Sequence, residues 1–148
     1  MIIIASDVSG YNIKNLVKFY LSEKYPNIIL EDLGVYSNKN DVNCVRLSQA
    51  VALRVKEMNN DTIGIIISDK NEIVIAANRL KGIRCVQCND IISAEKSRKD
   101  INANILSVKV NDSYDNKFLI IEKFINTKFD KKHYNIINIL DDINDRYL

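Results

Sequence analysis

One aspartate and one group of basic residues in this chain have side chains that could hold a small ligand. Asp7 follows the apolar run Met1–Ala5, and its carboxylate could either contact a ligand or cap the helix that follows. Lys131, Lys132 and His133 lie together before an amphipathic pattern. Their charges could hold a phosphate, or could simply be solvated near a helix N-terminus. Both interpretations of each group stay open at this point.

A C-x-x-C pair, Cys85 and Cys88, could be half of a zinc site or a redox couple. The pair lies in the apolar run 83–88, which is typical of a strand, where residues three apart point to opposite faces. No second C-x-x-C follows, and the only histidine, His133, lies far along the chain. We therefore predict core thiols, no metal site and no cofactor.

The composition excludes several classes of partner. The chain has 148 residues, 47% of them hydrophobic and 27% charged, which is ordinary for a soluble globular protein. Its net charge is +2 without a dense basic run, so we expect no nucleic acid and no membrane surface as partner. Apolar runs such as Ile63–Ile67 are too short to span a bilayer. An odd number of cysteines and no signal-peptide pattern favour a cytoplasmic protein.

Short apolar runs alternate with helical patterns, which is the signature of a parallel sheet wrapped by helices. The predicted fold is α/β, a doubly wound Rossmann-like three-layer sandwich with a five-stranded parallel sheet, in one domain over residues 1–148. Ser9 is the expected cap of the first helix. We expect strands at residues 1–5, 28–33, 63–67, 83–88 and 105–108. The helical apolar faces are expected at Ile13, Leu16, Val17, Tyr20 and Leu21; Leu47, Val51, Val55 and Met58; Ala76, Ala77 and Leu80; Tyr114, Phe118, Ile121 and Ile125; and Ile136, Leu140, Ile143 and Tyr147.

In such a sheet, ligands bind beyond the carboxyl ends of the strands, at the topological switch point. We therefore expect a site in the segments that follow the predicted strands. These segments are residues 6–10, 35–44, 68–72, 88–91 and 109–113.

Four short motifs lie in order along most of the chain. Residues 6–10 read S-D-V-S-G, residues 75–84 read I-A-A-N-R-L-K-G-I-R, residues 102–106 read N-A-N-I-L, and residues 124–129 read F-I-N-T-K-F. They resemble the S-D-H-A-G, I-A-A-N-K-x-x-G-I-R, N/D-A-N-V-L and F-L-x-T-x-F motifs of type B ribose-5-phosphate isomerases and the related galactose-6-phosphate isomerase subunits. The resemblance implies a phosphorylated sugar as ligand. It also implies a homodimer, or a hetero-oligomer with a paralogue, in which two subunits build each active site.

The family's reaction moves a proton between C1 and C2 of an aldose phosphate through an enediolate, which needs a base, oxyanion donors and cations for the phosphate. The family's C-G-T-G-x-G loop corresponds here to S-D-K-N-E at residues 68–72, one residue shorter. Ser68 stands where the family has its basic cysteine, and a hydroxyl is a far weaker base than a thiolate. The loop glycines are absent, and Asp69 places a negative charge where an anion would develop.

Other family positions are changed as well. Val8 replaces a histidine, Asp41 is what remains of a D-Y-P motif, and Asp100 stands where a histidine assists ring opening. Of the family's G-x-R phosphate motif only a basic residue remains, Lys109. Ile136 replaces the second arginine of the closing motif. Carried over position by position, the resemblance implies substrate-binding roles for Asp7, Val8, Asp41, Asn78, Asn102, Lys109, Lys132 and His133, and catalytic roles for Ser68, Asp100 and Glu72.

Glu72 enters because some branches of the family use a glutamate in the helix after the loop as base. Its alignment is off by about one residue, and a glutamate that opens a helix is commonly a dipole-favoured surface residue. Three hypotheses stay open. The chain is a catalytically impaired or non-catalytic subunit, an active isomerase with Glu72 as enolising base, or a module that binds a sugar phosphate or a partner without turnover. The lost glycines favour the first and third.

Overall fold

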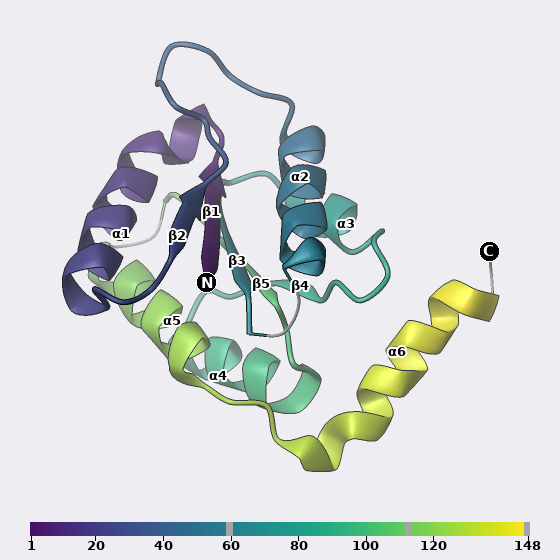
Figure 1. Cartoon of the computed structure of the whole chain (residues 1–148). Coiled ribbons are helices and arrows are strands. Elements are labelled where there is room, and N and C mark those ends of the chain that lie inside the picture. The colour runs from purple at the N-terminus through teal and green to yellow at the C-terminus, as the bar shows by residue number, and fades with distance from the viewer. Residues whose placement is uncertain (59–60, 112–113, 147–148) are drawn as a thin grey trace.

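Five parallel strands form the centre of the computed structural model, which describes residues 1–58, 61–111 and 114–146 (Figure 1). The strands are β1 (Ile2–Ser6), β2 (Leu30–Asp32), β3 (Ile63–Ile67), β4 (Cys85–Gln87) and β5 (Ile105–Val108). Their order across the sheet is β2-β1-β3-β5-β4, and every neighbouring pair runs parallel. β1 and β3 are buried along their whole length, which explains their continuous apolar runs. The predicted α/β fold with a five-stranded parallel sheet is confirmed.

Helices cover both faces of the sheet and give the fold its three layers (Figure 1). The helical elements are the 3-10 turns η1 (Val8–Gly10) and η2 (Lys131–His133) and the helices α1 (Tyr11–Lys24), α2 (Cys44–Glu57), α3 (Glu72–Ala77), α4 (Ile91–Ile101), α5 (Tyr114–Asn126) and α6 (Tyr134–Arg146). α1, α4 and α5 contribute Val17, Ala94 and Phe124 to one apolar core. α2 and α3 contribute Val51 and Ile73 to the other. Alternate strand side chains enter opposite cores, as the pleat requires.

The second and fourth strands are shorter than predicted. β2 spans residues 30–32 instead of 28–33, and β4 spans 85–87 instead of 83–88. Both strands lie at the edges of the sheet, where only one neighbour offers ladder hydrogen bonds.

α4 forms in a stretch where the sequence pattern predicts no helical face. Asp90 caps it, because its Oδ1 accepts from Ser93 N at 2.6 Å. The signal was weak, since only Ala94 and Ser97 of this helix are buried. A crossover between the parallel strands β4 and β5 nevertheless needs such an element.

One finer prediction about the helices is wrong, and two are met only in part. Leu16 and Met58, predicted on the apolar faces of their helices, are 48% and 39% exposed. Ser9 does not cap α1, because a 3-10 turn precedes that helix. The turn is capped by Asp7, whose Oδ1 accepts from Gly10 N at 3.2 Å.

The cysteines are buried free thiols, as predicted. Cys85 and Cys88 enter opposite apolar cores, because residues three apart on a strand face opposite ways. Burial raises the pKa of the Cys85 thiol to about 12, which makes it a poor nucleophile. Within the described residues, no three His, Cys, Asp or Glu side chains converge as a metal site would require.

α6 extends away from the body of the protein (Figure 1). Its predicted apolar residues Ile136, Leu140 and Ile143 are 41%, 38% and 49% exposed, whereas Ile137 is buried. Tyr147 lies outside the described residues. The helix therefore presents an apolar surface that the other described residues leave partly exposed.

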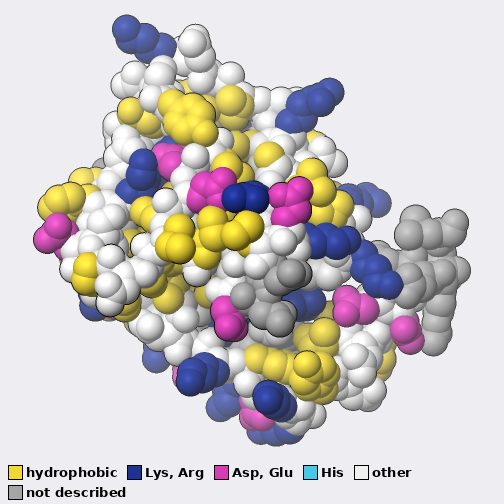
Figure 2. Space-filling view, viewed as in Figure 1, with side chains coloured by type: hydrophobic (Ala, Val, Ile, Leu, Met, Phe, Trp, Pro, Cys, Tyr) yellow, Lys and Arg dark blue, Asp and Glu magenta, His cyan; other side chains and the backbone are white. Residues whose placement is uncertain are grey.

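The surface shows no large field of one charge sign on the face in view. In Figure 2, basic and acidic side chains are interspersed with apolar ones over this face. Among the helices of the described chain, none is long and apolar enough to cross a membrane.

Candidate functional site

The carboxyl ends of β1 and β3 bring Asp7 and Ser68 into contact. Ser68 Oγ donates to Asp7 Oδ2 at 2.6 Å, and each residue is only 1% exposed. Asp7 Oδ1 accepts from Ser9 Oγ at 2.5 Å and from Gly10 N at 3.2 Å. Ser68 Oγ also accepts the backbone N–H of Lys70 at 3.2 Å. The Ser68 hydroxyl therefore donates its hydrogen bond to a carboxylate, and its oxygen already accepts a hydrogen bond from the backbone of the loop.

Gly10 allows the first loop to approach β3 closely enough for this contact. A Cβ at this position would lie 2.3 Å from Ile67 O, much closer than any real contact. A glycine at this position therefore lets the loop lie close enough to the end of β3 for Asp7 to contact Ser68.

Asp41 reaches back over the first loop from the segment between β2 and α2. Its Oδ1 accepts from Val42 N at 2.9 Å and from Val8 N at 3.3 Å. These backbone hydrogen bonds, that of Val42 first, hold the pKa of Asp41 below its ordinary value. The carboxyl edge therefore joins three predicted side chains, Asp7, Asp41 and Ser68, and the backbone of Val8.

Asp69 connects the loops that follow β3 and β5. Its Oδ1 accepts from Val110 N at 2.7 Å, and its Oδ2 accepts from Asn111 Nδ2 at 2.9 Å. Backbone N–H groups in such loops are the donors that otherwise bind anions. The negative charge of Asp69 is visible in the sequence, but its two donors lie 41 and 42 residues further along the chain.

Glu72 lies on the surface of the protein. It is the exposed first residue of α3, while the next residue, Ile73, is 0% exposed. Successive helix residues point about 100° apart, so an offset of one residue turns the carboxylate outward. Glu72 there lines a hollow of about 250 Å³ between α2 and α3, together with Gln49 and Arg79.

Asn78 and Lys109 occupy different surroundings. Asn78 Nδ2 donates to Cys85 O at 2.9 Å and its Oδ1 accepts from Cys85 N at 2.7 Å, so both ends of this amide anchor α3 to β4. Lys109 directly follows β5 and lies at the same edge as Ser68, whose N–H donates to Val108 O at 3.0 Å.

A second group of predicted residues meets around η2. Asp100 Oδ1 lies 3.5 Å from His133 Nε2, and Lys132 Nζ lies 3.1 Å from Asp130 Oδ2. Asp130 also caps η2, because its Oδ1 accepts from Lys132 N at 3.2 Å. Two predicted basic residues are thus each held by a carboxylate.

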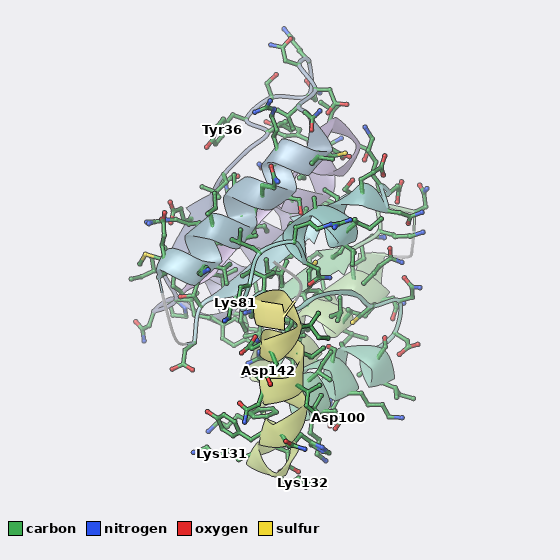
Figure 3. All side chains as sticks on the ribbon, turned by 90° about the vertical axis from the view of Figure 1, so that its right-hand side faces the viewer. Tyr36, Lys81, Asp100, Lys131, Lys132 and Asp142 are labelled. Atoms are coloured by element: carbon green, nitrogen blue, oxygen red, sulfur yellow. The ribbon has the colours of Figure 1, made fainter. Side chains whose placement is uncertain are left out.

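This second group lies at the amino edge of the sheet. Asn102 ends α4 in a left-handed conformation with φ 48°, just before β5 begins. Figure 3 shows Asp100 beside the start of α6, far from Tyr36 at the other end of the molecule. A strand of five residues separates the two edges by about 15 Å. One chain therefore holds its predicted site residues in two separate halves.

Lys14, which contacts the end of β2, was not among the predicted site residues. It is 0% exposed on the buried face of α1, beside Val17. Lys14 Nζ donates to Asp32 Oδ1 at 2.7 Å and to Val35 O at 2.6 Å. Because Val35 begins the segment that carries Asp41, this buried cation fixes the base of that loop. Its position on an otherwise apolar helix face is the sequence feature that could have identified this lysine.

Comparisons with known proteins agree with this architecture. Residues 2–140 match the Ribose/Galactose Isomerase family. A Rickettsia typhi protein with a provisional sugar phosphate isomerase name is 39% identical over 132 residues, which cover 87% of this chain and 88% of that one. A Listeria innocua protein named ribose-5-P isomerase B is 35% identical over 107 residues, 72% of this chain and 70% of that one.

Solved structures give the same result. The Thermotoga maritima ribose 5-phosphate isomerase superimposes with a TM-score of 0.86 at 33% identity, covering 95% of this chain and 97% of that one. The Clostridium thermocellum ribose-5-phosphate isomerase B superimposes with a TM-score of 0.90 at 29% identity, covering 99% of both chains.

Proposed function

This chain belongs to the Ribose/Galactose Isomerase family, and from that premise we propose that it binds a phosphorylated sugar with weak or no isomerase turnover of its own. In this proposal it is a catalytically impaired or non-catalytic subunit, either as a homodimer or beside a paralogue with an intact C-G-T-G-x-G loop. Buried free thiols favour a reducing compartment, and we place the protein in the cytoplasm.

The contact between Ser68 and Asp7 carries this proposal. A general base must have a lone pair within hydrogen-bond reach of the carbon acid. The proton of Ser68 points to Asp7 Oδ2, and its oxygen accepts from Lys70 N. Asp69 meanwhile holds the donors of the loop after β5. This edge can still bind sugar hydroxyls through carboxylates, but it is poorly suited to stabilise an enediolate.

The second half of the site comes, in our proposal, from a second chain. The group around Asp100, Lys132 and His133 lies too far from Asp7 to act with it inside one chain. α6 continues directly from that group and exposes apolar side chains along its length. Packing of α6 against a partner would bury this surface and carry the amino-edge group of one chain to the carboxyl edge of the other.

An active isomerase with Glu72 as base is the alternative. The hollow that Glu72 lines with Gln49 and Arg79 is large enough for part of a sugar. Enolisation there would need substrate to lie over α3 rather than over Ser68. The alternative therefore makes a distinct prediction about which substitution abolishes turnover.

An isomerase assay on the purified chain tests the proposal. Ribose 5-phosphate, allose 6-phosphate and galactose 6-phosphate are offered separately, with Glu72→Gln and, as a matched control, the exposed Glu95→Gln on α4. We expect no turnover above background, together with binding of a sugar phosphate seen as shifts of the amide signals of the Asp7 loop. Turnover lost only in Glu72→Gln would establish the alternative. Absence of any sugar-phosphate binding, alone or with a paralogue, would refute both.

A further inference from the structure

A cavity of about 590 Å³ opens at the amino edge of the sheet. Its walls come from the end of α2, the residues before β3 and β4, the end of α4, and η2 with the first residue of α6. Small-molecule sites commonly enclose about 300–1,000 Å³, so the cavity is of a suitable size for a metabolite.

Two arginines form the inner wall of this cavity. Arg84 Nε donates to Asn102 O at 2.9 Å and its Nη1 to Gly82 O at 3.2 Å. Arg98 Nε donates to Thr127 O at 3.3 Å and its Nη1 to Asn102 Oδ1 at 3.2 Å. All of these acceptors are neutral oxygens. Within the described part of the chain, neither guanidinium is paired with a carboxylate.

Burial disfavours both positive charges, and at Arg98 the charge of Arg84 adds to this effect. Burial first, and the charge of Arg84 second, lower the pKa of Arg98. Burial also lowers the pKa of Arg84, while the charge of Asp141 acts in the opposite sense. Arginine nevertheless stays protonated in proteins, so both charges persist. A half-buried pair of like charges is stabilised by an anion placed between them.

Two lysines extend this positive wall. Lys56 from the end of α2 and Lys131 from η2 line the same cavity. Asp61 lines it as well, and its charge acts against the lowering of the Arg98 pKa. Figure 3 shows Lys131 at the start of α6. Flexible lysines around fixed guanidinium groups are a usual arrangement for binding phosphate.

We propose that this cavity binds a small phosphorylated metabolite, with its phosphate between Arg84, Arg98 and Lys131. The inference goes beyond the proposed function, because Arg84, Arg98 and Lys131 have no part in the proposed sugar-phosphate site and their binding of a phosphate needs no turnover. A ligand held by Lys131 would also restrain η2, which carries the predicted site residues Lys132 and His133. Occupancy of the cavity would in this way bias the position of the amino-edge group.

Amide chemical shifts of the full chain, titrated with inorganic phosphate at constant ionic strength, test this site. We expect saturable shifts at Thr62, Gly82 and Asn104, around the cavity. Shifts confined to Ser9 and Gly10 at the carboxyl edge would overturn the inference while supporting the proposed function. Phosphate binding at the cavity without any isomerase turnover would leave both intact.

Two substitutions change the charge at the cavity in opposite directions, so binding should weaken in one and strengthen in the other. Both residues lie on the surface, where a substitution should not disturb folding. Lys131→Ala removes a cation and should weaken phosphate binding about threefold to tenfold, whereas Asp61→Asn removes the opposing charge and should strengthen it about threefold. Lys39→Ala, an exposed lysine of the β2–α2 segment, is the matched control and should change nothing.

Other occupants give different outcomes. An acidic segment of a second copy in the cavity would produce self-association that Lys131→Ala abolishes, with no phosphate-dependent shifts. That result would overturn the inference. Equal phosphate affinity in Lys131→Ala, Asp61→Asn and the unmodified chain would overturn it as well.

Discussion

Ser68 Oγ donates to Asp7 Oδ2 at 2.6 Å in a contact that is almost completely closed to solvent. The contact joins the ends of the two central strands, β1 and β3, at the edge where ligands of such sheets bind. It sets the electrostatics of that edge, because the group beside the Ser68 hydroxyl is a carboxylate. A negative charge that develops on a bound sugar would meet this carboxylate rather than a cluster of free N–H groups.

Replacement of Ser68 by cysteine should therefore fail to create an isomerase. A thiol buried next to the Asp7 carboxylate has its pKa raised by burial and by the negative charge. The glycine-rich loop that accompanies the family's cysteine is absent here, and Asp69 occupies donors of the loop after β5, so neither a thiolate nor an enediolate would be stabilised. We expect Ser68→Cys to show no turnover of ribose 5-phosphate and a thiol that alkylates only above about pH 9. Turnover that rises with thiolate formation near neutral pH would contradict this account.

Replacement of Asp69 by glycine should open the same edge to anions. The change frees Val110 N and Asn111 Nδ2, removes one negative charge, and leaves Ser68 and Asp7 in place. We expect inorganic phosphate to bind at least about tenfold more tightly, as measured by calorimetry, at a cost of about 1–2 kcal/mol in the free energy of unfolding.

Glu23→Gln is the control for this prediction, because it removes one exposed negative charge near the end of α1, away from the Asp69 loop. It should leave phosphate binding at the Asp69 edge unchanged. Equal affinity of Asp69→Gly and the unmodified chain would show that the Asp69 carboxylate does not occupy an anion position.

Replacement of Lys14 by methionine should be among the more costly single changes. Methionine fills a similar volume but removes the Lys14 donor from Val35 O and leaves Asp32 with Lys18 and Gly34 N as donors. We expect a loss of about 2–3 kcal/mol in the free energy of unfolding in urea. Lys18→Met is the control. Its side chain is 34% exposed, so we expect less than about 1 kcal/mol, and equal effects would contradict the assignment of Lys14 as the buried partner.

The same ion-pair group should make stability depend on acid pH. Burial opposes the ionised form of Asp32, but hydrogen bonds from Lys14, Lys18 and Gly34 N outweigh it, and the pKa of Asp32 lies below its ordinary value. As pH falls, the unfolded chain therefore takes up this proton first. The contribution of Asp32 is complete above its ordinary pKa of about 3.9 and is lost as pH falls through its folded value.

Urea unfolding at a series of pH values measures this contribution. The unmodified chain should lose stability more steeply than Asp32→Asn between about pH 5 and pH 2. Parallel curves for the two proteins would show that Asp32 has no depressed pKa in the folded state.

Periodicity was sufficient to predict the fold because the central strands are locally consistent. β1 and β3 are continuous apolar runs that can only be buried on both faces. The weaker edge strands and α4 were harder. β2 and β4 have a neighbour on one side only, and α4 buries few apolar side chains, so tertiary contacts rather than local pattern define them.

The sequence predicted which residues belong to the candidate site, but not where they lie relative to one another. Motif positions identified Asp7, Asp41 and Ser68, which do lie together. The same reasoning could not show that Asp100 and His133 lie at the other edge of the sheet. Nor could it show that Asp69 meets donors of the β5 loop, because such contacts join segments about 40 residues apart.

Replacement of Ile139 by glutamate tests whether α6 is the surface that brings the two halves of the site together. Ile139 is 55% exposed on α6, so a charge there should not disturb the fold of one chain. It would, however, be buried without a partner in any interface that covers this helix. We expect light scattering to show a dimer for the unmodified chain and a monomer for Ile139→Glu. The free energy of unfolding of a single chain should differ between the two proteins by less than about 0.5 kcal/mol.

Leu119→Glu on α5 is the matched control, because Leu119 is 49% exposed on a helix of the body. It should leave the dimer intact, which would separate a specific role of α6 from a general effect of surface charge. A dimer that survives Ile139→Glu would mean that another surface joins the chains. In that case Asp100 and His133 could not reach the Asp7 edge of a partner by way of α6, and a two-chain site would need a different geometry.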